Sequence, residues 1–165
     1  MIASPGLALF PCAVSRIRSF IKYWLPVLVW MVFIFGFSSD TMSFQHSSRI
    51  IGPLVHWLFP NVSSEAVNSI VFAVRKAAHV TEYALLALLI WRAVRKPVRP
   101  DLRGWSGAQA RLALILVVLY AATDELHQTF VPSRQGSVWD VLLDASGAAL
   151  GLLLLWAFGR WRRRW

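Results

Sequence analysis

Four long apolar segments constrain the fold of this chain more than any other feature of its sequence. Each is close to the ~20 residues that an α-helix needs to cross the hydrocarbon of a bilayer. They lie roughly at 23–37, 77–91, 112–127 and 138–158. The composition agrees, because 57% of the 165 residues are hydrophobic and only 15% are charged, which is far from the soluble average. The sequence therefore predicts an all-α membrane protein, a four-span transmembrane helix bundle.

The connection between the first two segments contains a shorter apolar stretch at 51–59. It holds Gly52 and Pro53 and is too short to span a bilayer, so it predicts an interfacial or re-entrant helix in the first outer loop. Ser63 or Ser64 is expected to cap the next helix, with Glu65 in its first turn. That helix should continue unbroken into the second span.

Basic residues sort to one side of the predicted spans. Thirteen of the seventeen Lys and Arg precede the first span, separate the second from the third, or follow the fourth. The positive-inside rule then makes that side cytoplasmic and places both termini there. The expected organisation is a cytoplasmic N-terminal segment at 1–22, a four-helix transmembrane domain at 23–158 and a basic cytoplasmic tail at 159–165.

The same distribution accounts for the net charge of +9 without a nucleic-acid partner. The first charge comes only at Arg16, and no small-residue cleavage site follows the first apolar run. This pattern favours an uncleaved signal anchor over a signal peptide.

The single cysteine, Cys12, excludes an internal disulfide framework.

Ionisable side chains gather at the outer ends of the last three spans. On the second span, Arg75, His79, Glu82 and Leu86 share one helical face, with Lys76 and Tyr83 at its margin. On the third, Tyr120, Asp124, His127 and Gln128 share a face, and Glu125 is expected to point elsewhere. On the fourth, Asp140, Asp144, Gly147 and Gly151 form a narrow stripe, whose glycines allow a neighbouring backbone to approach closely.

These groups are expected to face one another or a polar cavity. A charged side chain at mid-bilayer costs ~2.5–3.5 kcal/mol even on the lenient insertion scale. The cations Arg75, Lys76 and Arg134 oppose five acids of the same region. One interpretation is that ion pairs merely tie the helices together. The interpretation we favour is a functional polar pocket in the outer leaflet.

Two motifs in this region resemble those of a known family. The stretches "RKAAHVTEYALLALL", from Arg75, and "TDELHQTFVPSRQGSVWDVLLDASGAALG", from Thr123, are similar to the VanZ-like family of bacterial membrane proteins. The resemblance covers roughly residues 21–156 and extends to Ser38 and Ser39. Asp40 stands where the family pattern has a glutamine.

The resemblance implies a four-span protein of the bacterial inner membrane. The name-giving member of the family is associated with low-level resistance to teicoplanin, a lipidated glycopeptide, which need not hold for this chain. Carried over by motif, the candidate ligand-binding residues are Arg75, Lys76, His79, Glu82, Tyr83, Asp124, Glu125, His127, Gln128, Arg134, Asp140 and Asp144.

Three classes of function fit these residues. The first is binding, or transport, of an anionic lipid-linked headgroup, because Arg75, Lys76 and Arg134 suit a phosphate. The second is an intramembrane hydrolase or transferase that uses His79 and Glu82 as an acid–base pair, with Asp124 as a further catalytic candidate. The third is a non-catalytic partner of other envelope proteins.

A metal centre is the least favoured possibility. His79, Glu82 and Asp144 are the candidate ligands, but a His-x-x-Glu order that occurs once differs from the paired Glu-x-x-His ligands of bundle metal sites. Neighbouring cations would also repel a metal ion. The sequence therefore predicts no metal and no cofactor, and membrane lipids as the partners.

Overall fold

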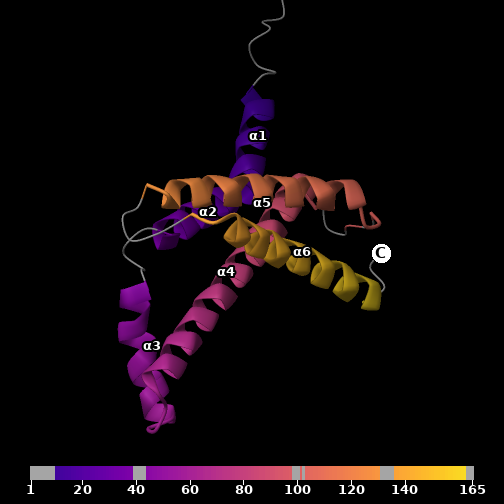
Figure 1. Ribbon diagram of the computed structural model, residues 1–165. Coiled ribbons are helices and arrows are strands. Elements are labelled where there is room, and N and C mark those ends of the chain that lie inside the picture. Colours follow the sequence, from indigo (N-terminus) through magenta and orange to yellow (C-terminus); the bar gives the residue numbers. More distant parts are fainter. Residues whose placement is uncertain (1–9, 39–43, 98–100, 102, 131–135, 163–165) are drawn as a thin grey trace, which may run out of the picture.

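The computed structural model describes residues 10–38, 44–97, 101, 103–130 and 136–162. Within these ranges the chain forms helices joined by turns and contains no strand. The helices are α1 (Phe10–Tyr23), α2 (Leu25–Ser38), α3 (Phe44–Leu58), α4 (Ser64–Arg95), α5 (Gly107–Gln128) and α6 (Val138–Trp161) (Figure 1).

Four helical stretches are long and apolar enough to cross a membrane. They are Arg16–Gly36, Ser64–Arg95, Gly107–Gln128 and Val138–Trp161. Large apolar side chains such as Val32, Leu119 and Leu154 are exposed along these stretches, as expected of helices that face lipid rather than water. The predicted fold class, an all-α protein with four candidate spans, is confirmed.

The first candidate span is broken between α1 and α2. Pro26 has no N–H and cannot donate to the carbonyl of Lys22, four residues earlier. A guanidinium nitrogen of Arg92, on α4, donates to this carbonyl instead, at 3.2 Å. The hydroxyl of Tyr23 donates to the carbonyl of Pro97, at 2.8 Å. The two helices therefore meet at an angle (Figure 1), and α1 is a separate helix that the sequence pattern did not predict.

Helix α4 begins and continues as the sequence indicates. The Ser63 hydroxyl accepts a hydrogen bond from the backbone N–H of Ala66, at 3.3 Å, and Glu65 lies in the first turn. At 32 residues, α4 is about 48 Å long, which exceeds the ~30 Å thickness of bilayer hydrocarbon.

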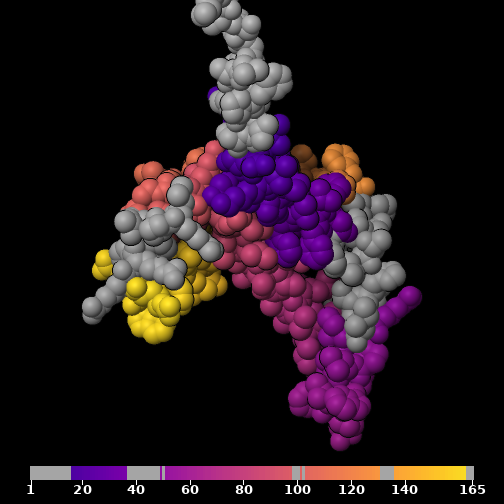
Figure 2. All heavy atoms as spheres, turned by 180° about the vertical axis from the view of Figure 1, so that it is seen from behind, coloured from indigo at the N-terminus to yellow at the C-terminus, as the bar shows by residue number. Residues whose placement is uncertain are grey.

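The first turns of α4 pack against α3 rather than against the main bundle. Val55 of α3 and Val67 and Val71 of α4 form a small buried cluster. The predicted short helix around Gly52 and Pro53 is thus present, as α3. Seen from behind, the α3–α4 end extends away from the rest of the molecule (Figure 2).

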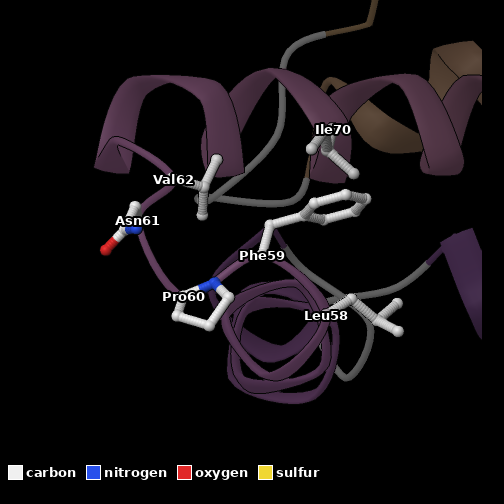
Figure 3. A pocket seen from close by; sticks show the side chains of 6 residues that line it. All are labelled: Leu58, Phe59, Pro60, Asn61, Val62 and Ile70. Atoms are coloured by element: carbon white, nitrogen blue, oxygen red, sulfur yellow. The ribbon is translucent and has the colours of Figure 1, made fainter.

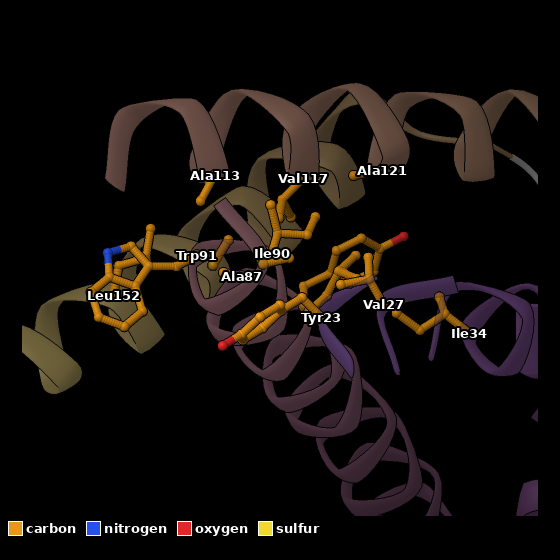
Figure 4. Packing of buried hydrophobic residues seen from close by; sticks show 14 residues of the cluster. Tyr23, Val27, Ile34, Ala87, Ile90, Trp91, Ala113, Val117, Ala121 and Leu152 are labelled. Carbon is orange, nitrogen blue, oxygen red and sulfur yellow. The ribbon is translucent and has the colours of Figure 1, made fainter. Parts of the chain in front are cut away.

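The main core lies where the second half of α4 crosses α5 and α6. Ile90 and Trp91 of α4 meet Val117 of α5 and Leu152 of α6, with Tyr23 and the α2 residues Val27 and Ile34 closing one side (Figure 4). Buried alanines from three helices, Ala87, Ala93, Ala113, Ala121 and Ala148, are part of this core. Small side chains at such crossings allow close helix approach, as is typical of membrane bundles.

The predicted glycine stripe is the contact between α6 and α4. A β-carbon on Gly147 would lie 2.5 Å from the carbonyl oxygen of Val80, and one on Gly151 would lie 2.9 Å from that of Ala84. Residue numbers rise together along this contact, so α4 and α6 run in the same direction. If consecutive spans cross the membrane in opposite directions, two helices separated by one further span must run in the same direction.

Candidate functional site

A cluster of polar side chains occupies the end of the bundle where α5 ends and α6 begins. We call it the polar cluster, and its members are Lys76, His79, Tyr83, Asp124, Glu125, Gln128, Asp140 and Asp144. Helical spacing brings them together, because each helix presents residues three or four positions apart on one face.

Two charged pairs join α4 to α6 on successive turns. The Lys76 ammonium contacts the Asp140 carboxylate, and these side chains are 30% and 31% exposed. One turn further along, His79 Nδ1 lies 3.6 Å from Asp144 Oδ1, and these side chains are 22% and 1% exposed. The cluster therefore has an outer layer that is about one third exposed and an inner layer that is more deeply buried.

The Asp144 carboxylate is the most buried acid of the cluster. Within the described ranges, neither of its oxygens accepts a hydrogen bond. A buried charge without hydrogen-bond donors is strongly disfavoured unless an opposite charge compensates it. His79 is the compensating group that the fold places beside Asp144, and it carries a charge only when both ring nitrogens are protonated.

A hydrogen-bond chain runs through the buried layer from α4 to the start of α6. The Tyr83 hydroxyl donates to Asp124 Oδ2 at 3.3 Å. The Gln128 amide nitrogen donates to the same oxygen at 3.3 Å and to Glu125 Oε1 at 3.2 Å. The other Glu125 oxygen accepts the backbone N–H of Ser137 at 2.9 Å. Three helices are thus tied together by one continuous polar chain.

The structure corrects the expected orientation of Glu125. Its spacing from Asp124 suggested that it points away from the cluster, but its side chain is buried and shares the Gln128 amide with Asp124. The approach to α6 folds back over this end of α5, so that a β-carbon on Gly136 would overlap the Glu125 carbonyl oxygen. Tyr83, placed at the margin of its face by spacing, is fully buried.

Helix α2 closes the remaining side, a contribution that sequence reasoning missed. The Tyr120 hydroxyl donates to the Met31 carbonyl at 2.6 Å. The Trp30 indole N–H donates to the Glu82 carbonyl at 3.0 Å. The ring of Phe35 lies 4.2 Å from that of His127, which therefore packs against α2. Apolar α2 has no charged residue that could have indicated this role.

The structure describes some of the remaining candidate residues and not others. Arg75 and Glu82 are partly buried on α4 beside the cluster. Arg134 and the motif residues Ser39 and Asp40 lie outside the described residues. In the described ranges, no three His, Cys, Asp or Glu side chains lie close enough together to hold a metal ion.

The larger of two described grooves lies away from the polar cluster, at the turn between α3 and α4 (Figure 3). It has a volume of about 590 Å³ and is lined by Leu58, Phe59, Pro60, Asn61, Val62 and Ile70. None of these six residues is charged, so this groove offers no cation to an anionic headgroup.

Chemically, the cluster combines a partly exposed pair, Lys76 and Asp140, with buried acids behind it. Lys76 can exchange its carboxylate partner for another anion. His79 directs Nδ1 toward a buried carboxylate, which leaves Nε2 as the nitrogen able to exchange a proton with another molecule.

The fold and this site define a class: a four-span helical membrane protein whose last three spans carry ionisable side chains into the bundle interior. A sequence model of the VanZ/LLP1 family matches residues 23–159, and the chain belongs to that family. No curated protein and no solved structure matches the chain. The family predicted from the two motifs is thereby confirmed.

Proposed function

We propose that the polar cluster binds the anionic headgroup of a lipid or lipid-linked molecule. The partly exposed Lys76–Asp140 pair carries this proposal. A phosphate can reach the Lys76 ammonium without unfolding the bundle and can replace Asp140 as its partner. Arg75, the preceding residue, supplies a second cation, and Arg134 is expected to supply a third from the loop before α6.

The acids behind Lys76 are compatible with an anionic ligand because they are buried and face other groups of the bundle. Asp124 accepts from Tyr83 and Gln128, Glu125 accepts from Ser137, and Asp144 lies beside His79. The layer that a ligand meets first contains Lys76, His79 and Asp140. At this depth the low local dielectric strengthens each contact with phosphate beyond its value in water.

We place the cluster in the outer leaflet of the bacterial cytoplasmic membrane, with both termini in the cytoplasm. The basic residues Arg92 and Arg95 end α4, Arg160 lies in the last turn of α6, and Arg111 lies near the start of α5. All four lie at the end of the bundle opposite the cluster, and basic ends of spans favour the cytoplasmic side.

Reporter fusions test this placement. A fusion after Arg99 should report a cytoplasmic location and a fusion after Arg134 an extracytoplasmic one. The reverse pair of results would move the cluster to the inner leaflet.

Native mass spectrometry of the purified protein tests the headgroup. Phosphorylated polyprenol and phosphatidylglycerol are compared with neutral diacylglycerol, for wild type, Lys76→Gln and Arg134→Gln. Wild type should retain the anionic lipids over the neutral one, and each variant should retain fewer of them. Lys22→Gln, an exposed change at the opposite end of the bundle, is the matched control. Equal retention by wild type and Lys76→Gln would refute the proposal.

A second candidate function is hydrolysis or group transfer on the bound headgroup. The observation that favours it is the His79–Asp144 pair, because a buried carboxylate beside one ring nitrogen orients a histidine for acid–base work at the other. This pair replaces the His79–Glu82 pair expected from spacing as the best geometric candidate. Turnover of a lipid phosphate or ester that His79→Ala abolishes, while lipid retention survives, would identify an enzyme.

The third candidate, an envelope interaction protein, gains no support from the glycines of α6. The Gly147/Gly151 stripe is covered by α4 of the same chain and offers no surface to a partner.

A further inference from the structure

A second groove, distinct from the polar cluster, lies at the other end of the bundle between α5 and α6. Its volume is about 420 Å³, within the ~300–1,000 Å³ of ordinary ligand sites. The walls are formed by Trp105, Ala110 and Leu114 on one side and Ala149, Leu153 and Trp156 on the other. Both helices are candidate spans, so the groove opens toward lipid hydrocarbon.

One wall of the groove is fixed by interactions that do not involve a ligand. Trp105 stacks on Trp91 with ring centroids 5.5 Å apart and an interplanar angle of 19°. The Arg95 guanidinium lies 5.2 Å over the Trp91 ring.

Arg95 itself is held by the loop between α4 and α5. Its side chain is 1% exposed. The Nε atom donates to Asp101 Oδ2 at 2.8 Å, and Nη1 donates to the Gly104 carbonyl at 3.1 Å. This network positions Trp105, the next residue after Gly104, so the groove is largely preformed.

The groove changes from polar to apolar along its length. Trp105, Arg111 and Trp156 lie toward the basic end of the bundle, where aromatic and basic side chains favour the membrane interface. Leu114 and Ala149 lie deeper, because α5 runs away from that end and α6 runs toward it. An amphiphile with a charged head and an alkyl chain has polar and apolar parts in the same order.

Charge decides which amphiphile fits. Arg111 is the one charged residue among the eight that line the groove, and a guanidinium binds phosphate through two parallel hydrogen bonds. No acid among the lining residues offers a partner to the amine of a zwitterionic headgroup.

We propose that this groove is a binding site for one anionic phospholipid, with the phosphate on Arg111 and an acyl chain along Leu114 and Leu153. The site uses none of the residues of the polar cluster, so the two proposals can be tested with different variants.

Native mass spectrometry with phosphatidylglycerol and phosphatidylcholine tests this site. Wild type should retain phosphatidylglycerol in preference to phosphatidylcholine. Because the polar cluster is also proposed to bind this lipid, the groove is tested in the Lys76→Gln protein. There Arg111→Gln should weaken the remaining retention of phosphatidylglycerol about tenfold, because charge-assisted hydrogen bonds to phosphate are lost. Arg18→Gln, an exposed change on α1, is the matched control and should have no effect.

A second variant tests the acyl chain. Ala149 is exposed on the groove wall, so Ala149→Phe fills the groove without displacing core atoms, and circular dichroism should show unchanged helix content. It should also weaken retention of phosphatidylglycerol. If adding Arg111→Gln or Ala149→Phe to the Lys76→Gln protein leaves its retention of phosphatidylglycerol unchanged, the groove site is overturned. If Lys76→Gln by itself abolishes all retention of this lipid, the groove site is also overturned, and the headgroup proposal is supported.

Discussion

Gly147 of α6 lies directly against the backbone of Val80 of α4: a β-carbon on this glycine would be 2.5 Å from the Val80 carbonyl oxygen and 2.9 Å from the Val80 Cα. Both atoms belong to the backbone and cannot move aside without shifting α4. The distance between the two helices, and hence the fit of the charged pairs above this contact, depends on the missing side chain.

Gly147→Ala should therefore destabilise the protein by about 1–3 kcal/mol, as overpacking does elsewhere. Gly36→Ala is the matched control, because a β-carbon on Gly36 would meet nothing within 4 Å. In a helix this control change should be neutral or stabilising by up to about 1 kcal/mol. Thermal unfolding in detergent gives both values. A Gly147→Ala protein as stable as the Gly36→Ala protein would contradict the packing described for this contact.

The two charged pairs between α4 and α6 should differ in their importance for stability. Asp144→Ala removes a fully buried acid beside His79 and should lower the free energy of unfolding by about 3 kcal/mol. Asp140→Ala breaks a pair whose members are about a third exposed, and should lower it by less than about 1 kcal/mol.

Glu65→Ala, at the exposed start of α4, serves as the surface control for the charged pairs. The readout is again the melting temperature. Equal melting temperatures for all three variants would show that the inner pair is solvated.

The break between α1 and α2 should be energetically coupled to α4. Arg92 donates to the Lys22 carbonyl, which is free to accept because Pro26 has no N–H to offer. Pro26→Ala restores that helical donor, so Arg92→Met should be less harmful in the Pro26→Ala protein than in wild type. A double-mutant cycle should give a coupling of about 0.5–1.5 kcal/mol. Strict additivity of the two changes would mean that Arg92 does not substitute for the missing donor.

The loop network around Asp101 should make stability depend on acid pH. Hydrogen bonds from Arg103, and then from Arg95, lower the pKa of the Asp101 carboxyl. Because the folded-state pKa is depressed, the carboxylate contributes stability above its unfolded pKa of about 3.9. This contribution is lost as the pH falls from there through the folded-state pKa.

Asp101→Asn should therefore melt below wild type at pH 6, and the difference should shrink as the pH is lowered toward 3. A difference independent of pH would show that the carboxylate charge does not hold the loop.

Helical periodicity predicted the parts of the site that depend on one helix alone. Asp140, Asp144, Gly147 and Gly151 fall on one stripe in any regular helix, and the structure uses all four against α4. Residues at the margin of a face were harder to assign. The burial of Tyr83 depends on how closely α5 packs against α4. The spacing of residues along α4 carries no information on this packing.

Features made by distant segments could not be predicted from local pattern. The bend before α2 involves Arg92, seventy residues further along the chain from Lys22. The burial of Glu125 depends on Gly136 and Ser137, which lie against it from the start of α6. The groove between α5 and α6 depends on Trp105, a loop residue held through Arg95. Each is set by tertiary packing, which overrides the preferences of short segments.

The pairing of α4 with α6 also has a consequence for biosynthesis. Lys76 and Asp140 are 64 residues apart, so at ordinary translation rates roughly 3–13 s separate their emergence from the ribosome. During that interval Lys76 and His79 of α4 precede the two α6 acids that they contact in the folded bundle, Asp140 and Asp144. The contact between α4 and α6 can therefore form only after the last helix has been made. A chain truncated before Asp140 would carry Lys76 and His79 without the acids that contact them in the complete bundle.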